Sequence, residues 1–184
     1  MANPFRKIVF IDRDGVINID LWKYVERWDE FKFEPTAIEA LKSLTDHGFD
    51  IVIISNQAGV GDGVFSETAM WGVHERMVET LKNHGAFIYS AQYCTHGKNA
   101  NCDCRKPKPG LLERAVAGLK FDKSKTFFVG DKLSDIEAGK NFGIKTILVR
   151  TGYGAKSEAK LTPDLRPDHI VENIGAAVPV ILKA

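Results

Sequence analysis

Two aspartates two residues apart follow an apolar run, in the stretch DRDGV at residues 12–16. One of the pair Asp12 and Asp14 could face a metal ion and a substrate, while the other is offset far enough to transfer a proton. Gly15 lets the chain turn away immediately afterwards. Taken alone, D-x-D-G is a weak signal, because Asp also accepts backbone hydrogen bonds in ordinary turns.

A second polar stretch, SNQAGVGDG, follows another apolar run and begins at Ser55. The Ser55 hydroxyl can bind an anion, and so can its backbone N–H and that of Asn56. The glycines permit close backbone approach. The G-x-x-x-x-G-K-[ST] spacing of a P-loop is absent, and a mobile glycine-rich surface loop is the alternative interpretation.

The third polar stretch is GDKLSDIEAG, which begins at residue 130. Asp131 lies at the end of an apolar run, Lys132 follows it, and Asp135 belongs to the next predicted helix. We expect Asp131 to lie with the other strand-end residues at the site. Alternatively, acidic residues at this point complement the dipole of a new helix, and Asp135 could do that without touching a metal.

The loop CTHGKNANCDC, residues 94–104, contains every cysteine of the chain. Cys94, His96, Cys102 and Cys104 supply three thiolates and one imidazole, a closed tetrahedral set that suits Zn²⁺. A site with no open position is structural, and it would stabilise a loop that has almost no apolar core. Reactive thiols are the alternative, since an odd number of clustered cysteines argues against disulfides.

Basic residues follow the last cysteine directly, in RKPKPG. Arg105 can hold a phosphate with two parallel hydrogen bonds, while Lys106 supplies a compact charge. Pro107 and Pro109 stiffen the segment that leads into the next predicted helix. We therefore expect the zinc loop to deliver the first two cations to a site, whereas Lys108 is interpreted as part of a solvated basic face.

Short apolar runs precede these polar stretches and predict strands. Several runs are apolar at almost every position, as in a parallel sheet covered on both faces. The predicted strands are KIVFI, DIVIIS, AFIYSAQY, TFFVG and KTILV, at residues 7–11, 50–55, 86–93, 126–130 and 145–149.

Helical patterns fill the segments between the strands. The predicted helices cover 36–48, 67–85 after a Ser66 cap, a segment from Pro109, a segment from a Ser134 cap to Gly143, and part of the tail 174–184. Strand–helix alternation gives right-handed crossovers and an open, Rossmann-like α/β sheet with helices on both faces. Ligands of such sheets bind outside the carboxyl ends of the strands, where the polar stretches lie. We expect one domain over 1–184, without a large cap domain.

The bulk composition describes a globular chain of balanced charge. Its 184 residues are 44% hydrophobic and 27% charged, and 25 basic against 24 acidic side chains give a net charge of +1. That balance argues against nucleic-acid or membrane binding through bulk charge, although it permits a local basic site. The N-terminal stretch lacks an apolar segment of signal-peptide length, and no run reaches the ~18 residues of a membrane span, so a cytoplasmic location is expected.

The stretches DRDGV, ISNQ, RKPKPG and GDKLSD follow the motif order of the haloacid-dehalogenase-like (HAD-like) phosphatase superfamily, which residues 6–150 resemble. With C-x-H…C-x-C-R-K-P and no large cap insertion, the chain is similar to the D-glycero-D-manno-heptose 1,7-bisphosphate phosphatases and the related histidinol-phosphatase domains. CDCRKPKPG, VGDKLSD and VRTG favour the heptose-bisphosphate branch. The resemblance implies a HAD-like fold and a Mg²⁺-dependent phosphomonoesterase acting on a small phosphorylated metabolite, such as a sugar phosphate.

The resemblance also implies a role for each motif residue. Asp12 would be the nucleophile, and Asp14 the general acid and base that reaches Mg²⁺ through its backbone carbonyl. Asp131 would complete the Mg²⁺ site, while Lys106 would neutralise the phosphoryl group and the nucleophile. Ser55 would bind a phosphoryl oxygen. The residues assigned to substrate binding are Arg13, Asp20, Tyr24, Asn56, Gln57, Arg105 and Lys132.

Two departures from the family pattern concern the substrate rather than the chemistry. NIDLWKYV, which carries Asp20 and Tyr24, is one residue longer than the usual spacing, and GVGDG with Asp62 stands where many heptose-bisphosphate enzymes carry a basic residue. Histidinol phosphate, another sugar phosphate and a nucleic-acid 3′-phosphate are the alternative substrates. The charge balance and the lack of a basic aromatic groove disfavour the last. A non-catalytic zinc module, in which the carboxylates are structural accidents, is the alternative outside enzymes.

The segment after the first motif contains two tryptophans, Trp22 and Trp28. They could shape the entrance of a site or cover the core, and we favour the second interpretation. Without a cap domain, we expect an open site in a monomer that admits a modest sugar phosphate.

Overall fold

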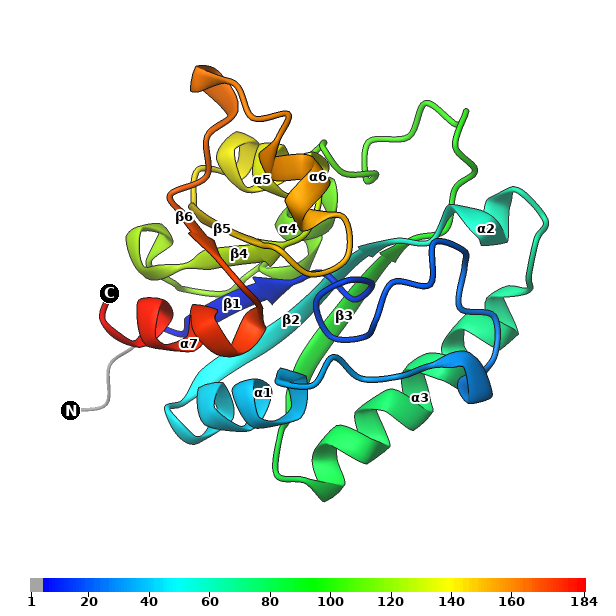
Figure 1. The fold of residues 1–184 in the computed structure, drawn as a ribbon, viewed down its shortest axis with the longest axis horizontal. Coiled ribbons are helices and arrows are strands. Elements are labelled where there is room, and N and C mark those ends of the chain that lie inside the picture. Colours follow the sequence, from blue (N-terminus) through cyan, green and yellow to red (C-terminus); the bar gives the residue numbers. More distant parts are fainter. Residues whose placement is uncertain (1–4) are drawn as a thin grey trace.

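A computed structural model describes residues 5–184. Its centre is a six-stranded sheet in the order β3-β2-β1-β4-β5-β6, with every neighbouring pair parallel (Figure 1). The strand order reverses between β1 and β4, which is the switch point where ligands of such sheets bind. The strands are β1 Lys7–Ile11, β2 Phe49–Asn56, β3 Ile88–Cys94, β4 Phe127–Gly130, β5 Lys145–Val149 and β6 His169–Val171.

The five predicted strands are confirmed, with boundaries that shift by one or two residues. The sequence did not predict β6, because its three residues make too short an apolar run to stand out from a polar tail. Pairing with β5 holds it in place, with Ile147 opposite His169.

The predicted helices are also present, with one different start. The helices are α1 Ala37–Asp46, α2 Ala58–Gly61, α3 Glu67–Asn83, α4 Gly110–Ala115, α5 Leu133–Phe142, α6 Gly154–Glu158 and α7 Ile174–Leu182. Ser66 caps α3 as predicted, since its hydroxyl accepts a hydrogen bond from the Ala69 N–H. The Ser134 cap of α5 is wrong: the N-cap is Lys132, two residues earlier, and its N–H donates to Asp135 Oδ2 at 3.0 Å.

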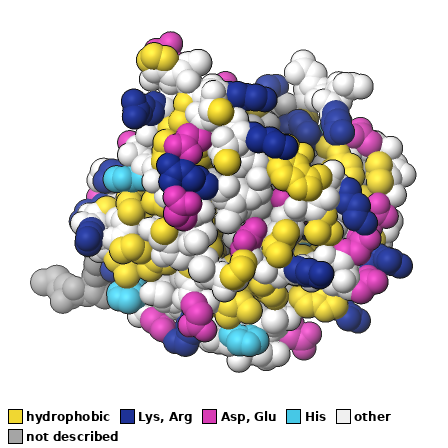
Figure 2. Space-filling view, in the orientation of Figure 1, with side chains coloured by type: hydrophobic (Ala, Val, Ile, Leu, Met, Phe, Trp, Pro, Cys, Tyr) yellow, Lys and Arg dark blue, Asp and Glu magenta, His cyan; other side chains and the backbone are white. Residues whose placement is uncertain are grey.

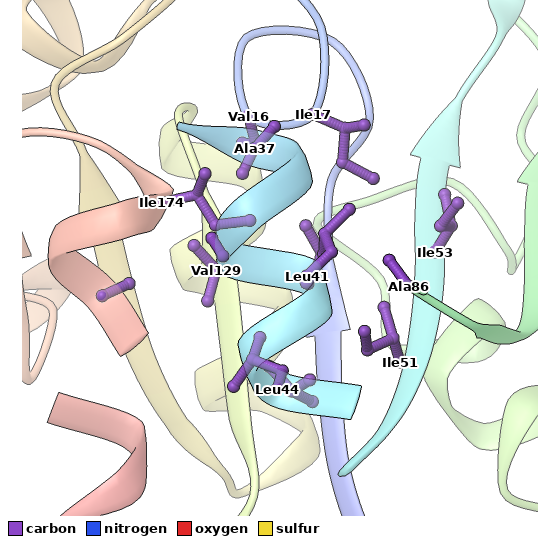
Figure 3. Close-up of a cluster of buried hydrophobic side chains, with 14 of the residues drawn as sticks. Val16, Ile17, Ala37, Leu41, Leu44, Ile51, Ile53, Ala86, Val129 and Ile174 are labelled. Carbon is purple, nitrogen blue, oxygen red and sulfur yellow. The ribbon is translucent and has the colours of Figure 1, made fainter. Parts of the chain in front are cut away.

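Alternate residues of the strands supply two apolar cores, one on each face of the sheet. The first core joins Val9 and Ile53 to α1, α3 and α7, and the second joins Phe10 and Ile54 to α4 and α5. Figure 3 shows the first core, where Leu41 of α1 lies over the strands. Each fully buried Leu or Ile contributes about 1.5–3 kcal/mol, so both layers fix the strand positions.

The connections at the carboxyl ends of the strands contain little regular secondary structure. The segment from 12 to 36 contains one 3-10 helix, Trp28–Glu30, and the segment between β2 and α3 contains only α2. Residues 5–184 therefore include no large cap domain. None of their helices has the length and apolarity needed to cross a membrane. Figure 2 shows acidic and basic side chains interspersed over one face of the molecule.

Candidate active site

Three carboxylates meet at the switch point of the sheet. Asp12 follows β1 and Asp131 follows β4, and these strands are neighbours, so the Asp12 N–H donates to Val129 O at 3.0 Å. Asp135 joins them from the first turn of α5. Ligand atoms of Asp12, Asp131 and Asp135 lie within 4.8 Å of one another, and all three residues are buried. We call these three residues the acidic cluster.

Lys106 brings a positive charge into the acidic cluster from a distant part of the sequence. Its Nζ lies 3.0 Å from Asp12 Oδ1 and 2.7 Å from Asp135 Oδ1, and it donates to Ile54 O at 2.9 Å. Asn56 holds the Lys106 backbone with two hydrogen bonds of 3.1 Å, one to its N–H and one to its carbonyl. The predicted meeting of Lys106 with Asp12 is therefore present.

Burial governs the electrostatics of the acidic cluster. It raises the pKa of Asp131 well above the usual range, an effect that the Lys132 charge opposes and the charges of Asp12 and Asp135 reinforce. Burial also raises the pKa of Asp135, although Lys106 offsets part of that rise. Burial alone would lower the pKa of Lys106, but the Asp12 and Asp135 charges outweigh it. Burial and the mutual repulsion of the carboxylates thus both disfavour full ionisation of the cluster.

Two glycines leave room for the Asp131 carboxylate. Gly15 and Gly152 both have positive φ, and a Cβ on either would overlap Asp131 Oδ2. The Tyr153 N–H donates to that oxygen at 2.8 Å, whereas Asp131 Oδ1 is buried and has no hydrogen-bond partner among residues 5–184. A buried, unpartnered oxygen within a carboxylate cluster fits a hard divalent cation such as Mg²⁺, which binds through oxygen.

Asp14 lies apart from the acidic cluster and accepts hydrogen bonds from three side chains. Arg13 donates to both of its oxygens, at 2.9 and 3.0 Å, and Asn18 and Gln57 donate at 3.0 and 2.9 Å. Burial would raise the pKa of Asp14, but the Arg13 charge and these hydrogen bonds outweigh it, so that pKa lies below the usual range. At rest, Asp14 is therefore an ionised and firmly oriented carboxylate.

Arg13 is one of the buried charged residues of the protein. Its side chain is fully buried under Asp14, so the predicted substrate contact does not fit, and we assign Arg13 the positioning of Asp14 instead. The reason is the alternation of side chains beyond β1, which turns Asp12 and Arg13 in different directions. Gln57 is also buried, and it donates to Ser55 Oγ at 3.1 Å as well as to Asp14.

Two residues that the sequence did not single out support Arg13 from α3 and β3. His74 Nδ1 lies 2.8 Å from the hydroxyl of Tyr93. Burial, and then the Arg13 charge, lowers the pKa of His74 to about 4, so this imidazole is neutral at pH 7. Burial raises the pKa of the Tyr93 phenol, while the Arg13 charge opposes that shift. Neither residue belongs to a motif, and only the fold reveals their connection to Asp14.

A cavity of about 320 Å³ opens beside these groups. Lys132 joins the cavity to the acidic cluster, because its Nζ lies 3.3 Å from Asp20 Oδ2 and 3.8 Å from Asp131 Oδ1. Five of the lining residues were predicted site residues, and the other four were not. The lining consists of Asp14, Asp20, Tyr24, Asn56 and Lys132, together with Trp22, Lys23, Lys98 and Tyr153.

We call the four unpredicted residues the cavity mouth. Trp22 is 54% exposed and lines the cavity, so its interpretation as a cover of the core is wrong. Trp28, in contrast, packs against the first core as expected. Arg105, predicted to bind substrate, donates to His96 O at 3.4 Å and does not line this cavity.

The predicted zinc ligands also come together. Cys104 Sγ lies 3.3 Å from Cys94 Sγ and 3.2 Å from His96 Nδ1, and Cys94 Sγ lies 3.7 Å from Cys102 Sγ. All four ligand atoms lie within 4.8 Å of one another. Three sulfurs and one imidazole at this spacing fit a tetrahedral Zn²⁺.

The loop of residues 94–104 packs against α2, beside which it runs in Figure 1. A Cβ on Gly61 would overlap the backbone of Thr95, His96 and Gly97, so glycine is needed for this close approach. Asp62, the acidic residue of GVGDG, accepts a hydrogen bond from the Lys98 N–H at 3.0 Å. That contact fixes the backbone of Lys98, which extends to the cavity mouth.

Comparisons with known proteins agree with this geometry. The model of the HAD-hydrolase-like family matches residues 103–177. The D-glycero-beta-D-manno-heptose-1,7-bisphosphate 7-phosphatase of Pasteurella multocida is 39% identical over 97% of both chains. That of Pseudomonas aeruginosa is 35% identical over 86% of this chain and 89% of its own.

A solved structure shows the same architecture. The D,D-heptose 1,7-bisphosphate phosphatase of B. bronchiseptica, complexed with magnesium and phosphate, superposes with a TM-score of 0.90 at 30% identity. The match covers 96% of this chain and 98% of that one. The chain is thus a capless HAD-like hydrolase and belongs to the phosphatase family of the D-glycero-D-manno-heptose-1,7-bisphosphate 7-phosphatases.

Proposed function

We propose that this phosphatase hydrolyses the 7-phosphate of a D-glycero-D-manno-heptose 1,7-bisphosphate, by way of a phosphoryl group carried on Asp12. The observation that carries the proposal is the meeting of the acidic cluster with Lys106 and Lys132 beside a cavity. A phosphate monoester dianion repels a carboxylate nucleophile, so the site must first cancel charge.

The residues of the chain supply most of that cancellation. Lys106 contacts Asp12 directly, and Lys132 stands between the acidic cluster and the cavity. Asp12, Asp131 and the backbone carbonyl of Asp14 would hold Mg²⁺, and the carboxylate of Asp135 lies close enough to join them. When bound there, Mg²⁺ supplies a Lewis acid that withdraws charge from phosphoryl oxygens.

The proposed reaction has two steps. A carboxylate oxygen of Asp12 forms a bond to phosphorus as the bond to the sugar oxygen breaks, and Asp14 gives that oxygen a proton. A water then attacks phosphorus, Asp14 takes its proton, and the bond between Asp12 and phosphorus breaks. Asp14 thus ends the second step protonated, which is the state in which the first step began.

The lowered pKa of Asp14 suits the second step more than the first, since a base must be ionised. The charge of an arriving phosphoryl group raises the pKa of a neighbouring carboxyl, because like charges disfavour ionisation. Substrate binding therefore favours the protonated Asp14 that the first step needs. Arg13, Asn18 and Gln57 orient the carboxyl in both steps.

The cavity chemistry supports a sugar carrying a second anion. Asp20, Tyr24 and Asn56 offer hydrogen-bond partners to hydroxyl groups, and Lys23, Lys98 and Lys132 offer positive charge. Those three lysines disfavour histidinol phosphate, whose ammonium group they would repel. The named activity of the relatives points to the same substrate class.

A phosphate-release panel tests this proposal. It compares heptose 1,7-bisphosphate, histidinol phosphate and several sugar monophosphates, with Mg²⁺ and with a chelator, as kcat/KM. We expect the bisphosphate to give the highest value and the chelator to abolish release. Equal values for all substrates, or turnover that survives removal of Mg²⁺, would contradict the proposal.

A further inference from the structure

Trp22 has an unusual backbone conformation. With φ of 61°, it is the one non-glycine residue with positive φ among residues 5–184. This left-handed region is unfavourable for a bulky side chain, and a residue is found there when surrounding contacts or a function require it. A hydrogen bond of 2.7 Å from the Trp22 N–H to Asp20 Oδ1 holds the backbone in place.

Burial of the indole does not explain that strained conformation. Trp22 is 54% exposed, and its ring partners are Tyr153, edge to face at 4.5 Å between centroids, and Lys156, whose Nζ lies 4.0 Å from the ring centroid. These partners belong to or adjoin α6 and leave half of the side chain uncovered. The uncovered indole lines the cavity that Lys132 joins to the acidic cluster.

A continuous set of contacts ties the indole to the reacting groups. Asp131 lies 3.8 Å from Lys132, Lys132 lies 3.3 Å from Asp20, and Asp20 caps the Trp22 N–H. The carboxylate Asp20 therefore fixes both the cation beside the acidic cluster and the turn that presents the indole. A phosphoryl group bound at the acidic cluster would leave its organic part in the cavity between them.

Aromatic rings and ammonium groups lie close to one another in the lining of this cavity. Lys132 lies 4.7 Å from the ring centroid of Tyr153, and Lys98 lies 5.8 Å from that of Tyr24. Aromatic rings bind apolar and C–H surfaces, while the cations attract anionic groups. A phosphorylated sugar ring presents both, with C–H groups on its faces and phosphoryl oxygens at its ends.

We propose that Trp22 is a specificity-determining residue whose indole contacts the C–H face of the sugar in a phosphorylated carbohydrate. This inference rests on the proposed function. In this proposal, the strained turn at Trp22 selects substrates whose leaving group contains a ring over substrates with a smaller leaving group. The indole contributes to binding the organic part and takes no part in bond making or breaking.

Two variants and a control test the assignment. Trp22→Gly removes the ring and suits the positive φ, while Trp22→Phe keeps an aromatic ring. Trp71→Phe is the matched control, since Trp71 is a partly exposed tryptophan on α3 that does not line the cavity. The substrates are heptose 1,7-bisphosphate and acetyl phosphate, which has no ring, and the readouts are kcat/KM for each and the melting temperature.

For Trp22→Gly, we expect the ratio of kcat/KM for heptose bisphosphate to kcat/KM for acetyl phosphate to fall about tenfold, mainly through KM. A tenfold change corresponds to the free energy of one good aromatic contact. The melting temperature should hold, because glycine relieves the backbone strain. Trp22→Phe should recover most of the ratio, and Trp71→Phe should leave it unchanged.

Three results would overturn the inference. In Trp22→Gly, an unchanged ratio would show that the indole does not select the ring. A lower melting temperature, with both substrates affected in parallel, would show that Trp22 is structural. If the wild type hydrolyses acetyl phosphate but no sugar phosphate, the role of Trp22 in binding a sugar is refuted, although the phosphatase chemistry is not. If the wild type hydrolyses neither substrate, the proposed function itself is refuted.

Discussion

The acidic cluster and the cavity mouth lie side by side but are built in opposite ways. Asp12, Asp131 and Asp135 are buried, and neighbouring strands and the first turn of α5 set their positions. Trp22 and Lys98 are exposed and stand on loops outside the sheet. The difference teaches that the sheet fixes the positions of the carboxylates, whereas the loops that line the cavity can change without disturbing the core.

The largest expected effect is on the nucleophile. Asp12→Asn keeps the shape of the side chain but removes the negative charge, so turnover should fall at least about a thousandfold. The melting temperature and the zinc content should stay close to those of the wild type. Phosphate release and metal analysis of the same sample measure these outcomes. Turnover above a tenth of the wild-type value would contradict the role of Asp12.

Lys106→Met should lower both activity and stability. Without the ammonium group, Asp12 and Asp135 are buried without their partner, which costs about 3–5 kcal/mol of the free energy of unfolding. Turnover should fall about a hundredfold, because the charge near the phosphoryl group is lost. Lys125→Met, at an exposed position, is the matched control.

The pH dependence of that variant sharpens the prediction. Burial already raises the pKa of Asp135, and loss of Lys106 raises it further. When folding raises the pKa of a carboxyl, the protein loses stability as the pH rises from the pKa of the unfolded state toward that of the folded state. In metal-free buffer, the stability deficit of Lys106→Met should therefore be smaller at pH 5 than at pH 8. An equal deficit at both would argue against the ion pairs.

Disruption of the Cys/His cluster should have an intermediate effect on both regions. Cys102→Ser should lower the melting temperature and the activity together, by about tenfold in kcat/KM, because the loop places Lys106 in the cluster and Lys98 at the mouth. Thermal unfolding, zinc content and phosphate release give the comparison. Unchanged melting with lost activity would point instead to direct catalysis by the thiol.

The smallest expected effect concerns the support beneath Asp14. The pKa of His74 is about 4 in the folded protein, below its usual value of 6.5, so the unfolded chain binds the proton first as pH falls. Stability should therefore decrease between about pH 6.5 and pH 4. His74→Gln should flatten this part of the plot of melting temperature against pH. A slope identical to that of the wild type would exclude His74 as its source.

The same contrast explains what the sequence could predict. Asp12, Asp131 and Lys106 follow apolar runs or a dense motif, and strand ends of a parallel sheet converge, so their meeting was predictable. The assignment of Arg13 to substrate failed because a motif position does not reveal that a side chain turns under its neighbour. Asp135 stayed ambiguous, since a helix cap and a metal ligand need the same residue type.

The cavity mouth was predicted least, for a physical reason. Trp22, Lys23 and Lys98 stand in loops without periodicity, and their positions depend on contacts between distant segments. The hydrogen bond from the Lys98 N–H to Asp62 and the edge-to-face contact of Trp22 with Tyr153 join such segments. No local sequence pattern indicates either contact, whereas each of the five predicted strands has a local apolar pattern.

Direct detection of a phosphorylated Asp12 tests the central claim. Enzyme is mixed with heptose 1,7-bisphosphate and Mg²⁺ and quenched in acid within one turnover. The mass of the peptide that contains Asp12 is then measured by mass spectrometry. The account predicts an added mass of one phosphoryl group on that peptide in the wild type and none in Asp12→Asn. Turnover without any such adduct, or an adduct on another residue, would contradict it.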